Sequence, residues 1–232
     1  TPAFAANGTS NSEVYKEETV YVNAKASGKT DKVTVSNWLK NSGSVSGDLE
    51  DESTLSDIKN VKGDEKYTSD GDKLTWNTED KDIYYQGTTD QDLPVSVKLT
   101  YYLDGKEIKP ADLKGKSGHL KIQVDYTNKE KKTVSVDGKQ EEVYTPFVMM
   151  TGMILPNETF SNVTIDNGKV ISDGSKNIVV GFGMPGMKES LNLDESKTED
   201  LTIPESLCVE ADVTDFTMSS TSVSYTHLRA HE

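Results

Sequence analysis

Apolar and polar residues alternate with a period of two along much of the chain, which is the pattern of a half-buried β-strand. The clearest case runs from Leu120 to Thr127, where Leu, Ile, Val and Tyr alternate with Lys, Gln, Asp and Thr. Two more long runs cover 95–103 and 207–213. Shorter runs of the same kind occupy 19–24, 32–36, 73–77, 82–86, 132–136, 161–165 and 177–182. The pattern predicts a chain made mainly of strands.

Turn-forming pairs separate these runs. Asp and Asn followed by Gly tolerate the positive φ angles of two-residue hairpin turns, so each pair predicts an antiparallel hairpin. The pairs are Asp70-Gly71, Asp104-Gly105, Asp137-Gly138, Asn167-Gly168 and Asp173-Gly174. Helical pattern is limited to one turn at 110–114, with Pro110 at its first position, and another at 53–61, capped by Ser53. Neither is long enough to connect parallel strands.

These elements predict an all-β fold, an antiparallel β-sandwich that is Ig-like in general architecture, with a smaller N-terminal β unit. The polar stretch 88–93, which ends at Pro94, marks the boundary. We expect a small β domain at 17–92 and a β-sandwich at 93–220. The acidic, weakly patterned stretch 188–200 is predicted to be a loop.

The two ends of the chain carry separate information. Ala3, Phe4 and Ala5 fit the small-x-small pattern of a signal-peptidase site, so 1–16 is interpreted as a signal-peptide remnant and disordered linker. At the other end, 223–232 matches the translation of a sequencing adapter in one reading frame. We therefore set 221–232 aside as an artificial tail and expect the natural protein to continue past Ser222. The single cysteine, Cys208, leaves no internal disulfide. The signal-peptidase pattern predicts an exported, extracellular or cell-surface location, and the single cysteine does not argue against it.

The formal net charge is −14, and this limits the classes of partner. An acidic surface repels phosphate backbones, so nucleic-acid binding is not expected. Acidic side chains also repel anionic lipid, and the chain contains no apolar run of 18 residues. We therefore expect membrane attachment only through a C-terminal segment beyond this chain.

Several stretches together carry a family resemblance. They are 18–28, 33–39, 82–89, 101–106, 113–118, 125–128, 146–152 and 211–216. The set resembles the N-terminal extracytoplasmic region of exported, membrane-anchored cell-envelope proteins of gut Firmicutes. Such proteins continue into Leu-rich, Gly-containing heptad repeats and a transmembrane segment, and are distantly similar to phage-infection proteins and to membrane proteins of Gram-positive secretion systems. The resemblance implies an envelope role and brings no catalytic residues with it.

Three aromatic residues are the candidate binding residues. Trp76, Tyr84 and Tyr85 lie on neighbouring strand runs and could form a platform for a sugar or a protein. Adjacent residues of a strand point to opposite faces, so one of Tyr84 and Tyr85 is expected to face solvent. Packing in the core is the simpler explanation for most of this set.

Candidates for catalysis and metal binding lack the partners that such chemistry needs. His119 is expected to be an exposed residue at a strand end, and Cys208 an inert small residue of a strand. The many carboxylates, including Asp70 and Asp72, are expected to be solvated turn residues. The Gly-rich stretch 181–186 lacks the Lys-Ser/Thr of a phosphate loop and is predicted to be a strand exit. We expect no catalytic residue, no metal and no cofactor.

The most apolar stretch is 145–156, which contains Phe147, Met149, Met150, Met153 and Ile154. A buried strand is the preferred interpretation. The alternative is a Met-rich contact surface.

These observations favour a non-catalytic extracytoplasmic binding or structural module, with an unidentified protein or cell-wall glycan as partner. A secreted carbohydrate-binding or glycan-active protein is one alternative. An ectodomain of a secretion or phage-receptor apparatus is the other.

Overall fold

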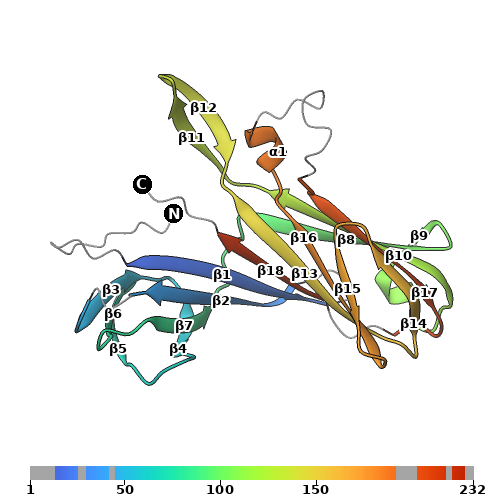
Figure 1. Cartoon of the computed structure of the whole chain (residues 1–232), viewed down its shortest axis with the longest axis horizontal. Coiled ribbons are helices and arrows are strands. Elements are labelled where there is room, and N and C mark those ends of the chain that lie inside the picture. Colours follow the sequence, from blue (N-terminus) through green and yellow to red (C-terminus); the bar gives the residue numbers. More distant parts are fainter. Residues whose placement is uncertain (1–13, 26–29, 42–44, 192–202, 218–220, 228–232) are drawn as a thin grey trace. The chain divides into compact units, whose positions relative to one another are not determined.

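A computed structural model describes residues 14–25, 30–41, 45–191, 203–217 and 221–227 (Figure 1). Nearly all of its elements are strands, and the paired strands are antiparallel. This confirms the predicted all-β antiparallel fold. The chain divides into two compact units. Unit 1 contains 1–21 and 32–91, and unit 2 contains 22–31 and 92–232. The predicted boundary lies between 92 and 93, so the observed division differs from it at residue 92 and in residues 22–31.

Unit 1 contains two sets of hydrogen-bonded strands. One has the order β1 (Tyr15–Ala24), β2 (Thr30–Lys40), β7 (Ile83–Thr88) and β4 (Ser56–Asn60), and the other has β3 (Asp48–Glu52), β6 (Lys73–Asn77) and β5 (Tyr67–Asp70). Alternation along the strands sends one set of apolar side chains between the sheets. The resulting core contains Leu39, Ile83 and Tyr85 from the first sheet and Leu49, Leu74 and Trp76 from the second.

Unit 2 is a two-layer sandwich. Its five-stranded sheet has the order β14 (Phe160–Ile165), β17 (Ser206–Val213), β10 (Gly118–Asn128), β8 (Val95–Leu103) and β9 (Lys106–Ile108). The facing strands are β15 (Gly168–Ser172), β16 (Lys176–Gly183), β13 (Phe147–Pro156) and β18 (Thr221–His227), in that order. The Tyr126 hydroxyl on β10 lies 2.5 Å from the Thr151 hydroxyl on β13, so the two layers share a buried hydrogen bond.

Three further elements belong to unit 2. Strands β11 (Lys131–Val136) and β12 (Lys139–Tyr144) form a two-stranded hairpin, which projects from the sheets in Figure 1. The base of this hairpin is tied to the short helix α1 (Met187–Ser190), because Lys131 Nζ lies 2.9 Å from Glu189 and the Tyr144 amide donates to Ser190 Oγ. The 3₁₀ turn η1 (Pro110–Asp112) begins with Pro110, as the sequence predicts.

The turn predictions hold with one exception. Asp104 and Asp137, with the glycines that follow them, have positive φ angles and close the β8–β9 and β11–β12 hairpins. Asn167-Gly168 is different, because it joins β14 of one sheet to β15 of the other. The hairpin prediction at this pair is therefore wrong. Each flanking strand pairs with a partner distant in sequence, β17 for β14 and β16 for β15.

Two local predictions also need correction. The helical turn predicted at 53–61 is wrong, because Ser56–Asn60 forms β4 and pairs with β7. The pairing with β7, which is distant in the sequence, outweighs the weak local preference of these few residues for a helical turn. In the predicted loop at 188–200, residues 188–190 belong to α1, and residues 192–200 lie outside the described part of the chain. Residues 1–13, including Ala3, Phe4 and Ala5, also lie outside it.

Residues 221–227, which were set aside from the sequence, form strand β18. It pairs with β13 from Phe147 opposite His227 to Met153 opposite Thr221. Val223 and Tyr225 are buried, and they alternate with serines and threonines as a half-buried strand requires. We therefore correct the exclusion of this segment from the fold. The pairing does not address the origin of 223–232, which stays a prediction.

Candidate functional site

Strand β13 is apolar on both of its faces. Its inward residues Phe147, Met149, Met153 and Leu155 are buried in the sandwich. The alternate positions point outward, and they are Val148, Met150, Gly152 and Ile154. The two interpretations of 145–156 therefore each describe one face, a buried one and a Met-containing outer one.

The outward residues of β13 line up with apolar residues of the neighbouring strands. Met150 lies opposite Phe182 of β16, Gly152 opposite Val180, and Ile154 opposite Ile178. Ile178 in turn lies opposite Ile171 of β15. We call this set the apolar face; its members are Val148, Met150, Gly152, Ile154, Ile171, Ile178, Val180 and Phe182.

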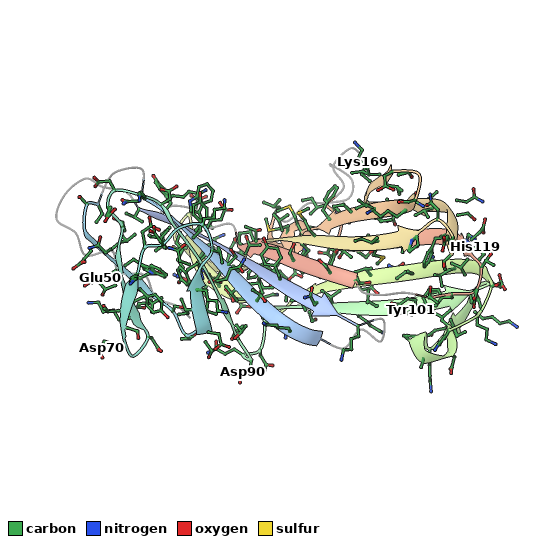
Figure 2. All side chains as sticks on the ribbon, turned by 90° about the horizontal axis from the view of Figure 1, so that it is seen from below. Glu50, Asp70, Asp90, Tyr101, His119 and Lys169 are labelled. Carbon is green, nitrogen blue, oxygen red and sulfur yellow. The ribbon has the colours of Figure 1, made fainter. Side chains whose placement is uncertain are left out.

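The apolar face is open to solvent. Met150 is 48% exposed, Ile154 53%, Ile171 50% and Phe182 50%. Two charged side chains occupy outward positions of β13, β15 and β16, and one of them lies opposite Val180 of the apolar face. They are Lys169, which points away from the green strands β8 and β10 in Figure 2, and Lys176, which lies 3.6 Å from Asp173. Contiguous exposed apolar surface of this kind is typical of a binding site.

The other sheet of the same sandwich gives a direct comparison. The outward residues of its central strands are mostly polar or charged. They are Lys98 and Thr100 on β8, His119, Lys121, Gln123 and Asp125 on β10, and Glu210 and Asp212 on β17, and the two exceptions are Tyr102 and Cys208. Antiparallel sheets with one solvated face normally show this pattern. The outer side of β13, β15 and β16 departs from it, so exposure to water does not explain its composition.

Gly152 lies at the centre of the apolar face, where neither crowding by the described residues nor its backbone conformation requires a glycine. A Cβ atom at Gly168, Gly181 or Gly183 would come within 2.2 to 2.7 Å of atoms of this chain, so those positions cannot hold a side chain. A Cβ at Gly152 would meet only the Ser222 carbonyl at 4.0 Å. The backbone of Gly152 also has no positive φ angle. Glycine weakens a strand, so its presence at an open position suggests close approach by another molecule.

Two of the three predicted binding residues are buried instead. Trp76 and Tyr85 are fully buried and stack on each other at 5.2 Å between ring centroids. The platform prediction is therefore corrected at Trp76 and Tyr85, because their strand faces point between the two sheets of unit 1. Burial, and then the charge of Asp51, raises the pKa of Tyr85, so its hydroxyl stays protonated and donates to Asp51 at 2.6 Å.

Tyr84 faces the other side of β7, as the alternation predicts, and it is partly exposed. Its ring stacks on Trp38 of β2 at 5.2 Å between centroids and 18° between planes. Lys62 Nζ lies 4.1 Å from the centroid of Tyr84, and Lys40 Nζ lies 3.9 Å from the centroid of Trp38. Sequence reasoning missed Trp38, because only the long-range pairing of β2 with β7 brings it opposite Tyr84. The lysines and the mutual stacking occupy the ring faces that a sugar would need.

His119 is exposed near a strand end, as predicted (Figure 2). Its two ring nitrogens lie 3.0 Å from Asp212 and 3.2 Å from Glu210. Hydrogen bonding to Asp212, and then to Glu210, raises the pKa of His119. Hydrogen bonds from Asn162 and from His119 lower the pKa of Asp212. An imidazolium held between two carboxylates is an ion-pair cluster and a poor general base.

Cys208 lies on β17 opposite Gln123 and is partly buried. Burial raises the pKa of its thiol, although the positive charge of Lys121 acts in the opposite direction. A protonated thiol is a weak nucleophile at neutral pH. Asp70 and Asp72 lie in the exposed β5–β6 hairpin turn, and among the described residues no group of three or more His, Cys, Asp or Glu side chains is placed to hold a metal ion.

The stretch 181–186 is a strand exit, as predicted. Gly181, Phe182 and Gly183 end β16, and Gly186 has a φ of 82° just before α1. α1 spans only Met187–Ser190, so no helix of the length found in phosphate loops follows.

Comparison with known proteins does not assign the chain to a family. No family model matches the chain, and no curated protein matches it. Within the described part of the chain, no helix has both the length and the apolar character needed to cross a membrane.

Proposed function

We propose that this chain is a non-catalytic extracytoplasmic binding module of a bacterial membrane-anchored envelope protein, and that it docks a protein through the apolar face. The observation that carries the proposal is the half-exposed set Met150, Ile154, Ile171 and Phe182 on adjacent strands. A protein partner fits this surface better than a glycan, because the surface has large apolar side chains and few hydrogen-bonding groups.

The location outside the cell is supported by sequence features. The Ala3-Phe4-Ala5 pattern and the family resemblance favour export, and the single cysteine does not argue against it. Attachment to the membrane would come from a segment beyond this chain. The apolar face would then be presented to other proteins of the envelope.

The carbohydrate-binding alternative has less support. Trp76 and Tyr85 are buried, and the rings of Tyr84 and Trp38 are covered by each other and by Lys62 and Lys40. The secretion or phage-receptor alternative is a more specific form of the docking proposal. Heptad repeats and a membrane segment after Ser222 in the complete gene would favour that form, and their absence would remove it.

Photo-crosslinking in intact cells tests the docking proposal. Phe182 in the full-length protein is replaced by a photoreactive phenylalanine derivative, and Val136 by the same derivative as a control. Val136 is 46% exposed and apolar, but it lies on the β11–β12 hairpin, away from the apolar face. We expect a protein crosslink from position 182 and none from position 136. Equal crosslinking from both positions, or none from 182, would contradict the proposal.

A further inference from the structure

A buried lysine and a buried aspartate of unit 1 are in direct contact. Lys16 Nζ on β1 lies 2.8 Å from each carboxylate oxygen of Asp51 on β3, and the two residues are 35 positions apart in the chain. Their side chains are 9% and 2% exposed, whereas both side chains of the Lys73–Glu50 pair are about half exposed. The contact joins strands of two different sheets within unit 1.

The distances are those of an amine close to a carboxyl carbon that it can attack. Because Lys16 Nζ is 2.8 Å from both Asp51 oxygens, it is no farther from the carbon Cγ between them than the roughly 3–3.5 Å of a near-attack pair. The carboxyl group also rotates easily about χ2, since a torsion onto an sp² carbon has broad minima. Such a rotation turns the face of the carboxyl group toward the amine.

The Tyr85 hydroxyl is placed to assist an attack of this kind. It donates to Asp51 Oδ2 at 2.6 Å, and its ring is held by stacking on Trp76. Burial, and then the charge of Asp51, raises the pKa of Tyr85, so the proton stays on the hydroxyl. When an amine adds to Cγ, negative charge develops on the carboxyl oxygens. A donor fixed at Oδ2 stabilises that charge, as the donors of an oxyanion hole do.

Burial favours the product of the attack as well. Two charges held away from water carry a desolvation cost that their attraction does not always repay, whereas an amide is neutral. Condensation therefore removes the cost and releases a water molecule to the solvent. The exclusion of water from this site then keeps hydrolysis, the reverse reaction, slow.

We propose that Lys16 and Asp51 condense to an intramolecular isopeptide bond that links β1 to β3. One proton passes from the Lys16 ammonium to the Asp51 carboxylate, and the neutral amine attacks Cγ. The C–N bond forms, the bond from Cγ to Oδ1 breaks, and Oδ1 leaves with two protons as water. Oδ2, held by Tyr85, becomes the amide carbonyl oxygen. The ammonium and the carboxylate supply every atom of the amide and the water, so the step needs no cofactor and no oxidant.

The bond would constrain unit 1 in the way that a disulfide constrains a domain. It closes a long loop and so restricts the unfolded chain. The single cysteine, Cys208, leaves this chain no internal disulfide that could serve the same purpose. The apolar face lies in unit 2, so this inference goes beyond the docking proposal and its test is independent of it.

Mass spectrometry of the purified chain, denatured before measurement, tests the proposal. We expect the wild type to be lighter than its sequence by one water molecule, and a tryptic digest to contain the Lys16 peptide joined to the Asp51 peptide. Lys16→Arg keeps the positive charge, but its guanidinium stays protonated and cannot attack, so this variant should have the full sequence mass. The control is Lys73→Arg in the exposed pair with Glu50, which should lose the water as the wild type does.

Another source of water loss must be separated from the bond. An Asp-Gly pair such as Asp70-Gly71 also loses water when it closes to a succinimide, and Lys16→Arg keeps every such pair. A wild-type chain of full sequence mass would overturn the proposal. A water loss that persists in Lys16→Arg, or that maps to peptides without Lys16 and Asp51, would overturn it too.

Tyr85→Phe tests the part played by the hydroxyl. During cell-free synthesis of the chain, the fraction that has lost water is followed with time. Removal of the donor to Oδ2 should slow this loss about a hundredfold. Near-ultraviolet circular dichroism checks that the variant keeps the native packing. An unchanged rate in the folded variant would contradict the role given to Tyr85.

Discussion

Unit 1 contains a buried ion pair whose loss should be costly. Lys16 Nζ lies 2.8 Å from both carboxylate oxygens of Asp51, and the Tyr85 hydroxyl donates to one of them at 2.6 Å. The side chains of Lys16 and Asp51 are 9% and 2% exposed. Water cannot replace a partner at this depth, so Lys16→Met leaves a buried carboxylate with a single hydrogen-bond donor, Tyr85.

The cost follows from this burial. Removing one partner of a buried ion pair destabilises a protein by about 3–5 kcal/mol, because the remaining charge is uncompensated. Whole domains are stable by only about 5–15 kcal/mol, so Lys16→Met should remove a large share of the stability of unit 1. Replacing both charges, in Lys16→Met with Asp51→Leu, should cost less than the single substitution, since no charge then remains buried and only the Tyr85 hydroxyl loses its acceptor.

Tryptophan fluorescence during urea unfolding at neutral pH measures this effect in unit 1. Both tryptophans of the chain, Trp38 and Trp76, belong to unit 1, and Trp76 stacks on Tyr85. The control is Lys73→Met, which breaks the exposed Lys73–Glu50 pair on β6 and β3 and should cost less than about 1 kcal/mol. The reasoning is refuted if Lys16→Met costs no more than Lys73→Met, or if the double variant is as unstable as Lys16→Met.

Three further predictions follow from other sites. The pKa of His119 is raised, so its imidazolium form stabilises the fold below the ordinary histidine pKa of about 6.5, and this contribution is lost as pH rises through the higher folded value. An NMR titration should place the midpoint of His119 above 6.5, and Asp212→Asn should lower that midpoint. A wild-type midpoint at or below 6.5 would contradict the geometry. Gly181→Ala should destabilise unit 2 by about 1–3 kcal/mol, because the new Cβ would lie 2.3 Å from Leu207. Gly152→Ala should keep the stability or raise it by up to about 1 kcal/mol, because its Cβ meets no close atom and its φ is not positive. Equal thermal denaturation of the two variants would be evidence against this. Cys208 should react with iodoacetamide more slowly at neutral pH than a small free thiol, since burial raises its pKa; a faster reaction would contradict that assignment.

Local patterns in the sequence predict individual strands well. The run at 73–77 coincides with β6, and 95–103 with β8, because apolar and polar residues alternate along most of both runs. Strands β3 and β4 were not predicted, since Asp48–Glu52 is mostly acidic and Ser56–Asn60 mostly polar. Their conformation depends on pairing with β6 and β7, which is not visible in the local sequence.

The candidate site was predictable only in part. The sequence identifies 145–156 as the most apolar stretch, and alternation separates its two faces. It does not show that Phe182 lies opposite Met150, or that Ile171 continues the row from Ile154 through Ile178, because strand register is set by contacts between distant segments. The same limit explains why Trp76 and Tyr85 were candidates for binding. Alternation places Tyr84 and Tyr85 on opposite faces, but only the packed structure shows which face is the core.

Oxidation of methionine side chains tests most directly whether the apolar face is covered when the protein acts. Met150 is half exposed, while Met149 and Met153 on the same strand are buried and serve as internal controls. Brief hydroxyl-radical labelling with mass spectrometry is applied to the dilute isolated chain and to the full-length protein on intact cells. We predict rapid oxidation of Met150 in the dilute chain, and on cells a fall toward the rates of Met149 and Met153. An equal rate at Met150 in both samples would show that nothing binds this face, and would contradict the account.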